Sequence, residues 1–403
     1  MAELLAVAEA LRRVLAEAKA LPVTDTAIND AHGLVLAKDL VALRTQPPLS
    51  NSAMDGYAVR AADVAHAPVT LDVIGESAAG HPFNGTIGPG QVTRIFTGAV
   101  MPAGSDTVVI QEHTTRDGTK VTVQKPTAKT RNVRNAGIDF SEGELLLAKG
   151  RRLTDRDLML AAAMNYPKLP VHRRPKIAVL GTGDELVPPG SSTKPGQIVY
   201  SNGFALMALA RSEGAEPIDL GVVGDNVDDT VAAIRKARDV GADVLVTMGG
   251  ASVGDHDLVQ KALAAEGLTL SFWKIALRPG RPTMHGKLGD MQVLGLPGNP
   301  VSSYVCAVLF LVPLIRTLMG RADVELNFEN AVLGKDMPEN DERQDYLRAT
   351  LTAGPEGLAA TPLPHQDSSL MAPLAKADCL LIRAPHAPAA PAGSPCVILK
   401  LAL

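Results

Sequence analysis

The pattern of apolar and polar positions changes character several times along the 403 residues. Near the N-terminus, apolar residues between Leu4 and Ala18 recur at the spacing of one helix face, which predicts an amphipathic helix. Acidic residues stand early in this segment, so it is not interpreted as a signal peptide. Residues 69–147 carry short β-type runs separated by glycine, proline and aspartate turns. That pattern predicts a small all-β domain.

Helical character returns at Thr154, which forms a capping-box pattern with Asp157. Residues 1–45 and 146–170 are therefore predicted to form one discontinuous helical linking domain. A β domain of residues 46–145 would be inserted into it.

From Lys176 onward, β-type runs alternate with helical runs, which predicts a parallel sheet with crossover helices. This open α/β domain, residues 171–320, would close with a hairpin and an apolar helix that begins at Asn299 and Pro300. The apolar helix reaches membrane-spanning length, but it contains two serines, a proline and an arginine, so a buried core helix is expected. Residues 321–403 return to strands and predict a C-terminal β domain. The predicted fold class is α/β plus β in several domains.

Composition narrows the possible partners. Apolar residues make up 46% and charged residues 20%, as in an ordinary globular protein. Aromatic residues are only 3%, so the stacking platforms of single-strand nucleic-acid binders are scarce. The net charge of −4 means that an anionic ligand needs a local cationic patch. Three widely spaced cysteines without metal-binding spacing fit reduced thiols. We expect a cytoplasmic protein without nucleic-acid or membrane partners.

Acids and glycines gather where the predicted parallel strands end, and ligands of open α/β sheets bind at those ends. The three segments are GTGDEL (181–186), Val223-Gly224-Asp225 and GGASVGDHD (249–257). Clustered carboxylates beside such loops suggest Mg²⁺, although the acids could also be helix caps and turn formers. Neither a Rossmann nor a Walker motif is complete here. Five acids could converge at this edge: Asp184, Glu185, Asp225, Asp255 and Asp257. Glu185, Asp225 and Asp257 are the candidates for the metal, and Gly249, Gly250 and Ser252 are the candidates for close approach of a phosphate or pterin.

Cations follow in WKIALRPGRP (273–282). If this segment is one strand, Lys274 and Arg278 point the same way about 13 Å apart, and Arg281 follows the Pro-Gly turn. Cations close to carboxylates suit phosphoanhydride chemistry with a metal, whereas a solvated basic face is the alternative. Gly298, Asn299 and Ser302 stand at a helix start, which either binds an anion or is simply capped.

Six motifs occur together in one order: PPLSNSAMDGYAVR (47–60), RIFTGAVMP (94–102), GTGDEL, TMGGASVGDHD, RPGRP and LPGNPVS. The set closely resembles the molybdopterin molybdotransferase family, which includes bacterial MoeA and the gephyrin E domain. The resemblance covers essentially the whole chain. It implies an elongated homodimer of multidomain subunits that inserts molybdate into adenylyl-molybdopterin, with Mg²⁺ as cofactor and release of AMP. A further candidate partner is the adenylyltransferase that supplies this substrate.

Residue roles follow from the resemblance, motif by motif. It implies that Asp55, Thr97, Lys274 and Arg278 are catalytic positions, and that Glu185, Asp225 and Asp257 hold metal. Arg348 in DYLRA and Ser368 in HQDSS resemble substrate-binding or molybdate-binding positions. RPGRP stands where the family usually has KPGKP, which keeps the charge but changes the donor geometry. Two other functions stay open: the molybdopterin adenylyltransferase, and a non-enzymatic scaffold like gephyrin.

Overall fold

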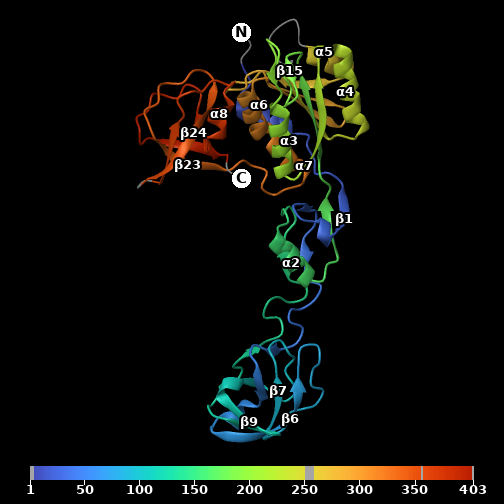
Figure 1. The fold of residues 1–403 in the computed structure, drawn as a ribbon, viewed down its shortest axis with the longest axis vertical. Helices are drawn as coiled ribbons and strands as arrows, with labels where there is room; N and C mark the ends of the chain where they lie inside the picture. The colour runs from blue at the N-terminus through green and yellow to red at the C-terminus, as the bar shows by residue number, and fades with distance from the viewer. Residues whose placement is uncertain (1–3, 250–257, 355–356, 402–403) are drawn as a thin grey trace.

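The computed structural model describes residues 4–249, 258–354 and 357–401. The molecule is elongated (Figure 1): an α/β domain and a C-terminal β domain lie side by side at one end, a narrow linking region follows, and a β domain lies at the far end. The predicted class, α/β plus β in several domains, is confirmed.

The α/β domain is built on a six-stranded sheet in the order β17-β14-β18-β22-β21-β19. The first four strands are parallel, whereas β21 and β19 are antiparallel to their neighbours. The central strands are buried along their whole length, as expected for a sheet covered on both faces. The bounds are β14 Lys176–Thr182, β17 Glu216–Val223, β18 Val244–Met248, β19 Thr269–Trp273, β21 Met284–Leu288 and β22 Met291–Leu296.

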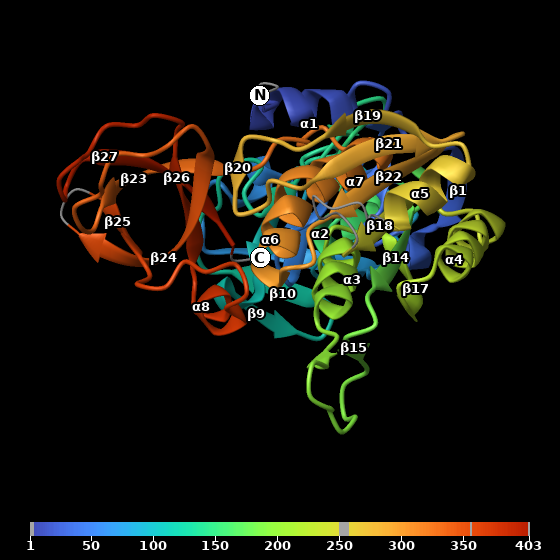
Figure 2. The same ribbon diagram turned by 90° about the horizontal axis from the view of Figure 1, so that it is seen from above.

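Helices cover both faces of this sheet, as Figure 2 shows. Helices α4 (Val227–Asp239) and α5 (Leu258–Ala265) pack on one face. The other face carries α3 (Asn202–Ser212) and the continuous helix 300–318, which comprises α6 (Pro300–Cys306), a π-helical turn (Ala307–Leu311) and α7 (Val312–Leu318). The continuous helix 300–318 is the one described helix that is long and apolar enough to cross a membrane, but 83% of its most apolar 18-residue window is buried inside the protein. A short parallel pair of strands, β15 (Leu186–Val187) and β16 (Ile198–Val199), projects from the domain together with the loop that joins them.

Helix α1 (Val7–Leu15) was predicted to belong to the linking domain, but it packs on the α/β domain instead. Its buried residues Val7, Ala10 and Val14 join the core of the α/β domain, against α7 and the π-helical turn. The periodicity predicted the helix and its apolar face correctly, but an apolar face does not specify which domain covers it.

The linking region is part sheet and part helix. Strands β1 (Val23–Ala27), β13 (Lys168–His172) and β2 (Val35–Leu36) form a small antiparallel sheet beside α2 (Asp155–Ala163). The predicted capping box is present, because Thr154 and Asp157 each accept a hydrogen bond from the other's backbone N–H. Two chain segments connect this region to the inserted β domain, and they pair with each other at two places. Strand β3 (Leu40–Val41) pairs with β12 (Leu145–Leu147), and Gln46 pairs with Phe140.

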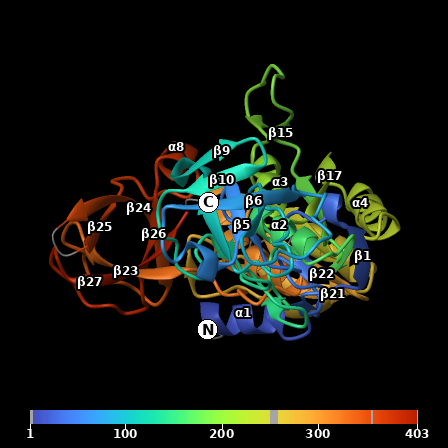
Figure 3. The same ribbon diagram turned by 90° about the horizontal axis from the view of Figure 1, so that it is seen from below.

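The inserted β domain lies below the linking region in Figure 1 and faces the viewer in Figure 3, which looks at the molecule from below. Its six-stranded sheet has the order β8-β5-β7-β6-β10-β9, and β4 pairs with β11 beside it. The bounds are β4 Asn51–Ser52, β5 Gly56–Val59, β6 Val69–Ser77, β7 Gln91–Ile95, β8 Thr107–Ile110, β9 Thr114–Asp117, β10 Lys120–Val123 and β11 Val133–Arg134.

The C-terminal domain curls its sheet on itself, because β24 pairs with β20, β25 and β26. Strand β20 comes from the α/β part of the chain, so this pairing ties the two domains together. The bounds are β20 Leu277–Arg278, β23 Phe328–Leu333, β24 Gln344–Gly354, β25 Gly357–Pro362, α8 Met371–Ala375, β26 Cys379–Arg383 and β27 Pro395–Lys400.

Candidate functional site

A large pocket of about 1020 Å³ lies at the carboxyl ends of β14 and β18. This is the edge at which open α/β sheets bind their ligands. The C-terminal domain adds Ser369 and Met371 to its wall, so the pocket lies between two domains. Five residues predicted from the sequence line it: Glu185, Asp225, Gly249, Gly298 and Asn299.

Glycine backbone forms the floor of this pocket. Gly249 has a φ of +94°, and a Cβ built on it would lie 2.5 Å from the carbonyl oxygen of Thr182. A Cβ on Gly298 would lie 3.6 Å from the Cα of Gly249, so the two loops pass close to each other. A side chain at Gly249 would be strained and would collide with backbone, which explains why this position is glycine.

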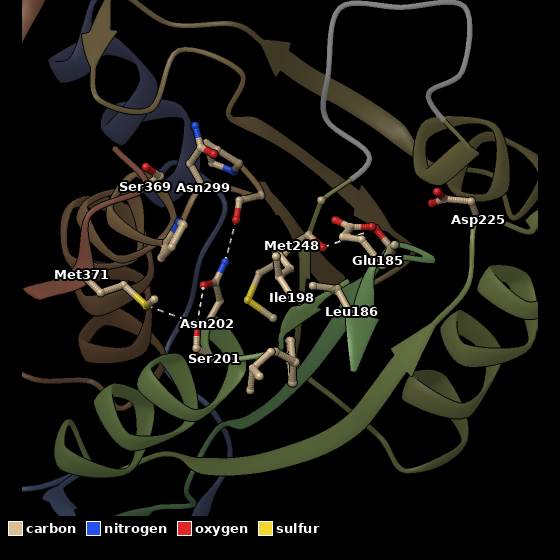
Figure 4. A pocket seen from close by; sticks show the side chains of 18 of the residues that line it. Glu185, Leu186, Ile198, Ser201, Asn202, Asp225, Met248, Asn299, Ser369 and Met371 are labelled. Atoms are coloured by element: carbon tan, nitrogen blue, oxygen red, sulfur yellow. Dashed lines mark hydrogen bonds between the residues drawn. The ribbon is translucent and has the colours of Figure 1, made fainter. Parts of the chain in front are cut away.

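The two described acids lie on one side of the pocket, opposite Asn299, Ser369 and Met371 (Figure 4). Glu185 follows β14, and its backbone carbonyl accepts from the N–H of Ile198 in β16 at 2.8 Å. Asp225 follows β17, and its N–H donates to the Asp184 carboxylate at 2.9 Å. Asp184 therefore shapes the loop that carries Asp225. Asp257, with Gly250 and Ser252, lies outside the described residues.

The opposite wall joins the two domains through hydrogen bonds. Asn299 donates from Nδ2 to the Ser368 hydroxyl at 2.9 Å, and Val301 N–H donates to the Ser368 carbonyl at 3.0 Å. Asn299 holds the helix N-cap position, but its side chain makes no capping bond because it reaches across to Ser368. Neighbouring Ser369 donates from its hydroxyl to Asp367 at 2.6 Å.

The two adjacent serines consequently differ in chemistry. The Ser369 proton is directed to a carboxylate, and this bond, together with the backbone N–H of Ser369, lowers the pKa of Asp367. The Ser368 hydroxyl accepts from Asn299, so its own proton is available to another acceptor.

The predicted cationic strand is wrong, because the segment 273–282 is not one strand. Strand β19 ends at Trp273, Lys274 adopts a φ of +72°, and β20 pairs with the C-terminal domain. Lys274 places Nζ 4.0 Å from the centre of the Trp273 ring. Arg281 is exposed, whereas Lys274 is partly buried.

Arg278 is a cation paired with acidic residues rather than a free one. Its guanidinium donates to Asp345, to Asp341 at 2.7 Å and to Asn340 at 2.9 Å. These bonds raise the pKa of Arg278, with the Asp345 carboxylate as the largest cause. The residue thus fastens β20 to the C-terminal domain.

Arg348 is likewise occupied. It is 1% exposed, and its guanidinium donates to the carbonyls of Asp367 at 3.0 Å and His365 at 3.1 Å. Ser302 is also buried, at 4% exposure, within α6. Neither residue lines the pocket.

Asp55 and Thr97 form a second polar cluster, in the inserted β domain at the far end of the molecule. The Asp55 carboxylate accepts from the backbone N–H and the hydroxyl of Thr97, both at 2.8 Å. These two bonds lower the pKa of Asp55, and nearby Arg94 lowers it further. The guanidinium carbon of Arg94 lies 5.2 Å from the ring centre of Tyr57 and 4.8 Å from that of Phe96.

Sequence reasoning missed several lining residues and Arg94. Asn202 donates to the Gly298 carbonyl at 2.8 Å, and the Ser201 hydroxyl donates to the Met371 sulfur at 3.4 Å. Both stand at the start of α3, so a helix start after a strand was an available signal. Ser369 adjoins the predicted Ser368, but only the fold shows which serine faces the pocket.

Three family models match successive parts of the chain. They are the MoeA N-terminal region (domain I and II) over residues 5–165, a probable molybdopterin binding domain over 178–317 and the MoeA C-terminal region (domain IV) over 330–401. Together they account for most of the sequence.

Named relatives agree with these matches. The chain is 41% identical to a molybdopterin molybdenumtransferase of Nostoc sp., over 74% of this chain and 70% of the relative. It is 35% identical to the enzyme of that name from Haemophilus influenzae, over 88% of each chain. A solved molybdopterin biosynthesis MoeA protein from Pyrococcus horikosii is 31% identical, with a TM-score of 0.85 and full coverage of both chains. The chain therefore belongs to the molybdopterin molybdenumtransferase family, as its motifs predicted.

Proposed function

We propose that this protein is a molybdopterin molybdenumtransferase, which inserts molybdenum from molybdate into adenylyl-molybdopterin and releases AMP. The observation that carries the proposal is the interdomain pocket at the carboxyl edge of the α/β sheet, in a chain whose relatives bear this name. Its volume of about 1020 Å³ suits a ligand as large as an adenylylated pterin.

Both reactants are anions, so they repel each other unless the site supplies donors and positive charge. We assign the Ser368 hydroxyl as an oxyanion donor, because Asn299 fixes its orientation and leaves its proton available. Arg281 and Lys274 are the proposed cations near the substrate. Gly249, Gly298 and Asn299 would contact the pterin or phosphates from the pocket floor, and Gly250 and Ser252 would extend that surface.

We propose Mg²⁺ as the cofactor of this pocket. Magnesium is usually held by one or two carboxylates, with waters and substrate phosphate oxygens completing the shell. Glu185 and Asp225 supply two carboxylates on one wall, and Asp257 is the proposed third. Among the described residues, no group of three or more His, Cys, Asp or Glu could hold a metal. The bound ion would supply charge neutralisation for the phosphoanhydride.

The direct test is to incubate the purified protein with adenylyl-molybdopterin, Mg²⁺ and molybdate. We expect AMP and molybdenum cofactor to appear together, and omission of molybdate to suppress both. Formation of adenylyl-molybdopterin from ATP and molybdopterin, without molybdate-stimulated AMP release, would instead identify the adenylyltransferase.

Asp225→Asn tests the metal assignment. The change keeps the side-chain shape but removes a charge, so the Mg²⁺ concentration for half-maximal AMP release should rise by about tenfold. Asp228→Asn, in the first turn of α4, is a matched control, because Asp228 lies close by in sequence but does not line the pocket. An equal response of the two variants would remove Asp225 from the metal site.

We further propose a homodimer whose sites are shared between subunits. Asp55 and Thr97 belong to the inserted β domain, which lies at the opposite end of the molecule from the pocket (Figure 1). They could serve a pocket only if a partner subunit brings its β domain there. Two-fold symmetry would then create two identical composite sites. The adenylyltransferase that makes the substrate is a proposed further partner, and the free cysteines support a cytoplasmic location.

A further inference from the structure

The segment between β25 and α8, residues 363–370, crosses from the C-terminal domain to the pocket wall without regular secondary structure. It carries Ser368 and Ser369. A loop of this kind has no sheet or helix ladder to satisfy its backbone, so other groups must fix its position. We propose that Gln366 is a positioning residue of the reaction, which holds this segment so that Ser369 lines the pocket and Ser368 stays bonded to the lining residue Asn299. The proposal rests on the proposed function.

Gln366 makes three hydrogen bonds with its side-chain amide. Oε1 accepts from the Arg348 N–H at 3.0 Å, and Nε2 donates to the Arg348 carbonyl and the Leu363 carbonyl, both at 2.9 Å. The amide therefore bonds to both backbone groups of one residue in β24, as a neighbouring strand would. Backbone pairing continues beside it, because Leu363 N–H also donates to the Arg348 carbonyl at 2.9 Å.

The guanidinium of Arg348 also binds the backbone of segment 363–370. Its two bonds go to the carbonyls of His365 and Asp367, the residues on either side of Gln366. Side chain and backbone of Arg348 thus hold three consecutive loop residues. Because Arg348 is 1% exposed, this anchor lies in the protein interior.

The far end of the segment is fastened to the α/β domain. Val301 is the second residue of α6, and an N–H at that position has no partner within its own helix. The Ser368 carbonyl supplies that partner at 3.0 Å, while the Ser368 hydroxyl accepts from Asn299. Ser368 is therefore held between the Gln366 anchor on one side and α6 on the other.

If segment 363–370 lost the Gln366 hydrogen bonds, its position would vary and the Ser368 proton would be misplaced relative to the oxyanion. Errors of about 1 Å in a reacting geometry can lower rates by about 10²-fold. Gln366 itself lies behind the wall and does not line the pocket, so its effect must pass through Ser368.

The test compares Gln366→Leu with Gln344→Leu. Both changes remove a half-buried amide from the C-terminal domain, but Gln344 bonds to the Tyr346 hydroxyl and not to the segment. In Gln366→Leu, hydrogen exchange at the Val301 amide should become about tenfold faster, since loss of a bond in a released loop exposes that N–H. The molybdate concentration for half-maximal AMP release should rise about tenfold, with the melting temperature within a few degrees of wild type. Gln344→Leu should change neither quantity.

Gln366→Glu provides a second variant that keeps the size of the side chain. Its carboxylate can still accept from Arg348 N–H, but it places oxygen against two carbonyls where the amide donated. It should therefore impair molybdate use at least as much as leucine does. Unchanged Val301 exchange in both Gln366 variants, or unchanged molybdate dependence despite faster exchange, would overturn the proposal. If wild-type protein releases no AMP with molybdate, the proposed function fails instead, and the exchange result still decides whether Gln366 anchors Ser368.

Discussion

An equal mixture of co-refolded Asp55→Ala and Glu185→Ala chains is expected to regain about a quarter of wild-type AMP release, although each variant alone stays near background. In the proposed shared site, Asp55 comes from one subunit and Glu185 from the other. A mixed dimer then collects both defects in one site and leaves the second site intact. Random pairing of equal amounts makes half of the dimers mixed, and each of these has one good site of two.

A double variant provides the reciprocal control. When chains carrying both changes are co-refolded with an equal amount of wild-type chains, every site in a mixed dimer contains one defect. Only the wild-type dimers remain active, about a quarter of the total. If both residues instead served a site in their own chain, this mixture would retain about half of the activity, and the first mixture would recover nothing. Native mass spectrometry should verify that mixed dimers have formed.

Glu213→Ala should lower the free energy of unfolding of the α/β domain by about 3 kcal/mol, because it leaves buried cations without their partner. Glu213 ends α3 and is 5% exposed. Its carboxylate accepts two bonds from Arg316 at 2.9 Å and one from Arg321 at 2.8 Å. The side chains of Arg316 and Arg321 are 17% and 8% exposed, so water cannot replace the lost carboxylate fully. Asp323 remains beside Arg321, which keeps the loss at the low end of the usual range.

Glu266→Ala is the matched control for this prediction. Its carboxylate is 8% exposed and also binds two arginines, Arg235 and Arg238. Those side chains are 65% and 39% exposed, however, so both can be rehydrated when the carboxylate is removed. The loss should be about 1 kcal/mol or less. Trp273 is the only tryptophan and belongs to β19, so its fluorescence in a urea titration follows this domain. Equal losses in the two variants would contradict the burial argument.

The sequence by itself determined the local structure and the order of the motifs. Alternating β-type and helical runs predicted the parallel strands β14, β17 and β18 because side-chain periodicity is set by the backbone geometry of each element. The Thr154–Asp157 capping box was predictable for the same reason, since both partners lie in one helical turn. The placement of Glu185, Asp225 and Gly249 around one pocket was predictable, because strand ends of an open sheet gather at one edge.

Only the tertiary structure decided what each charged side chain faces. The RPGRP motif was interpreted as free cations, yet Arg278 pairs with Asp341 and Asp345, which lie more than 60 positions later in the chain. Arg348 reads as an anion clamp, yet it is buried behind the segment that carries Ser368. The local pattern also did not determine that α1 packs on the α/β core, or that Asp55 lies far from the pocket. The physical reason is common to all four: periodicity and capping act within a few residues, whereas ion pairing and burial depend on which distant elements the folded chain brings together.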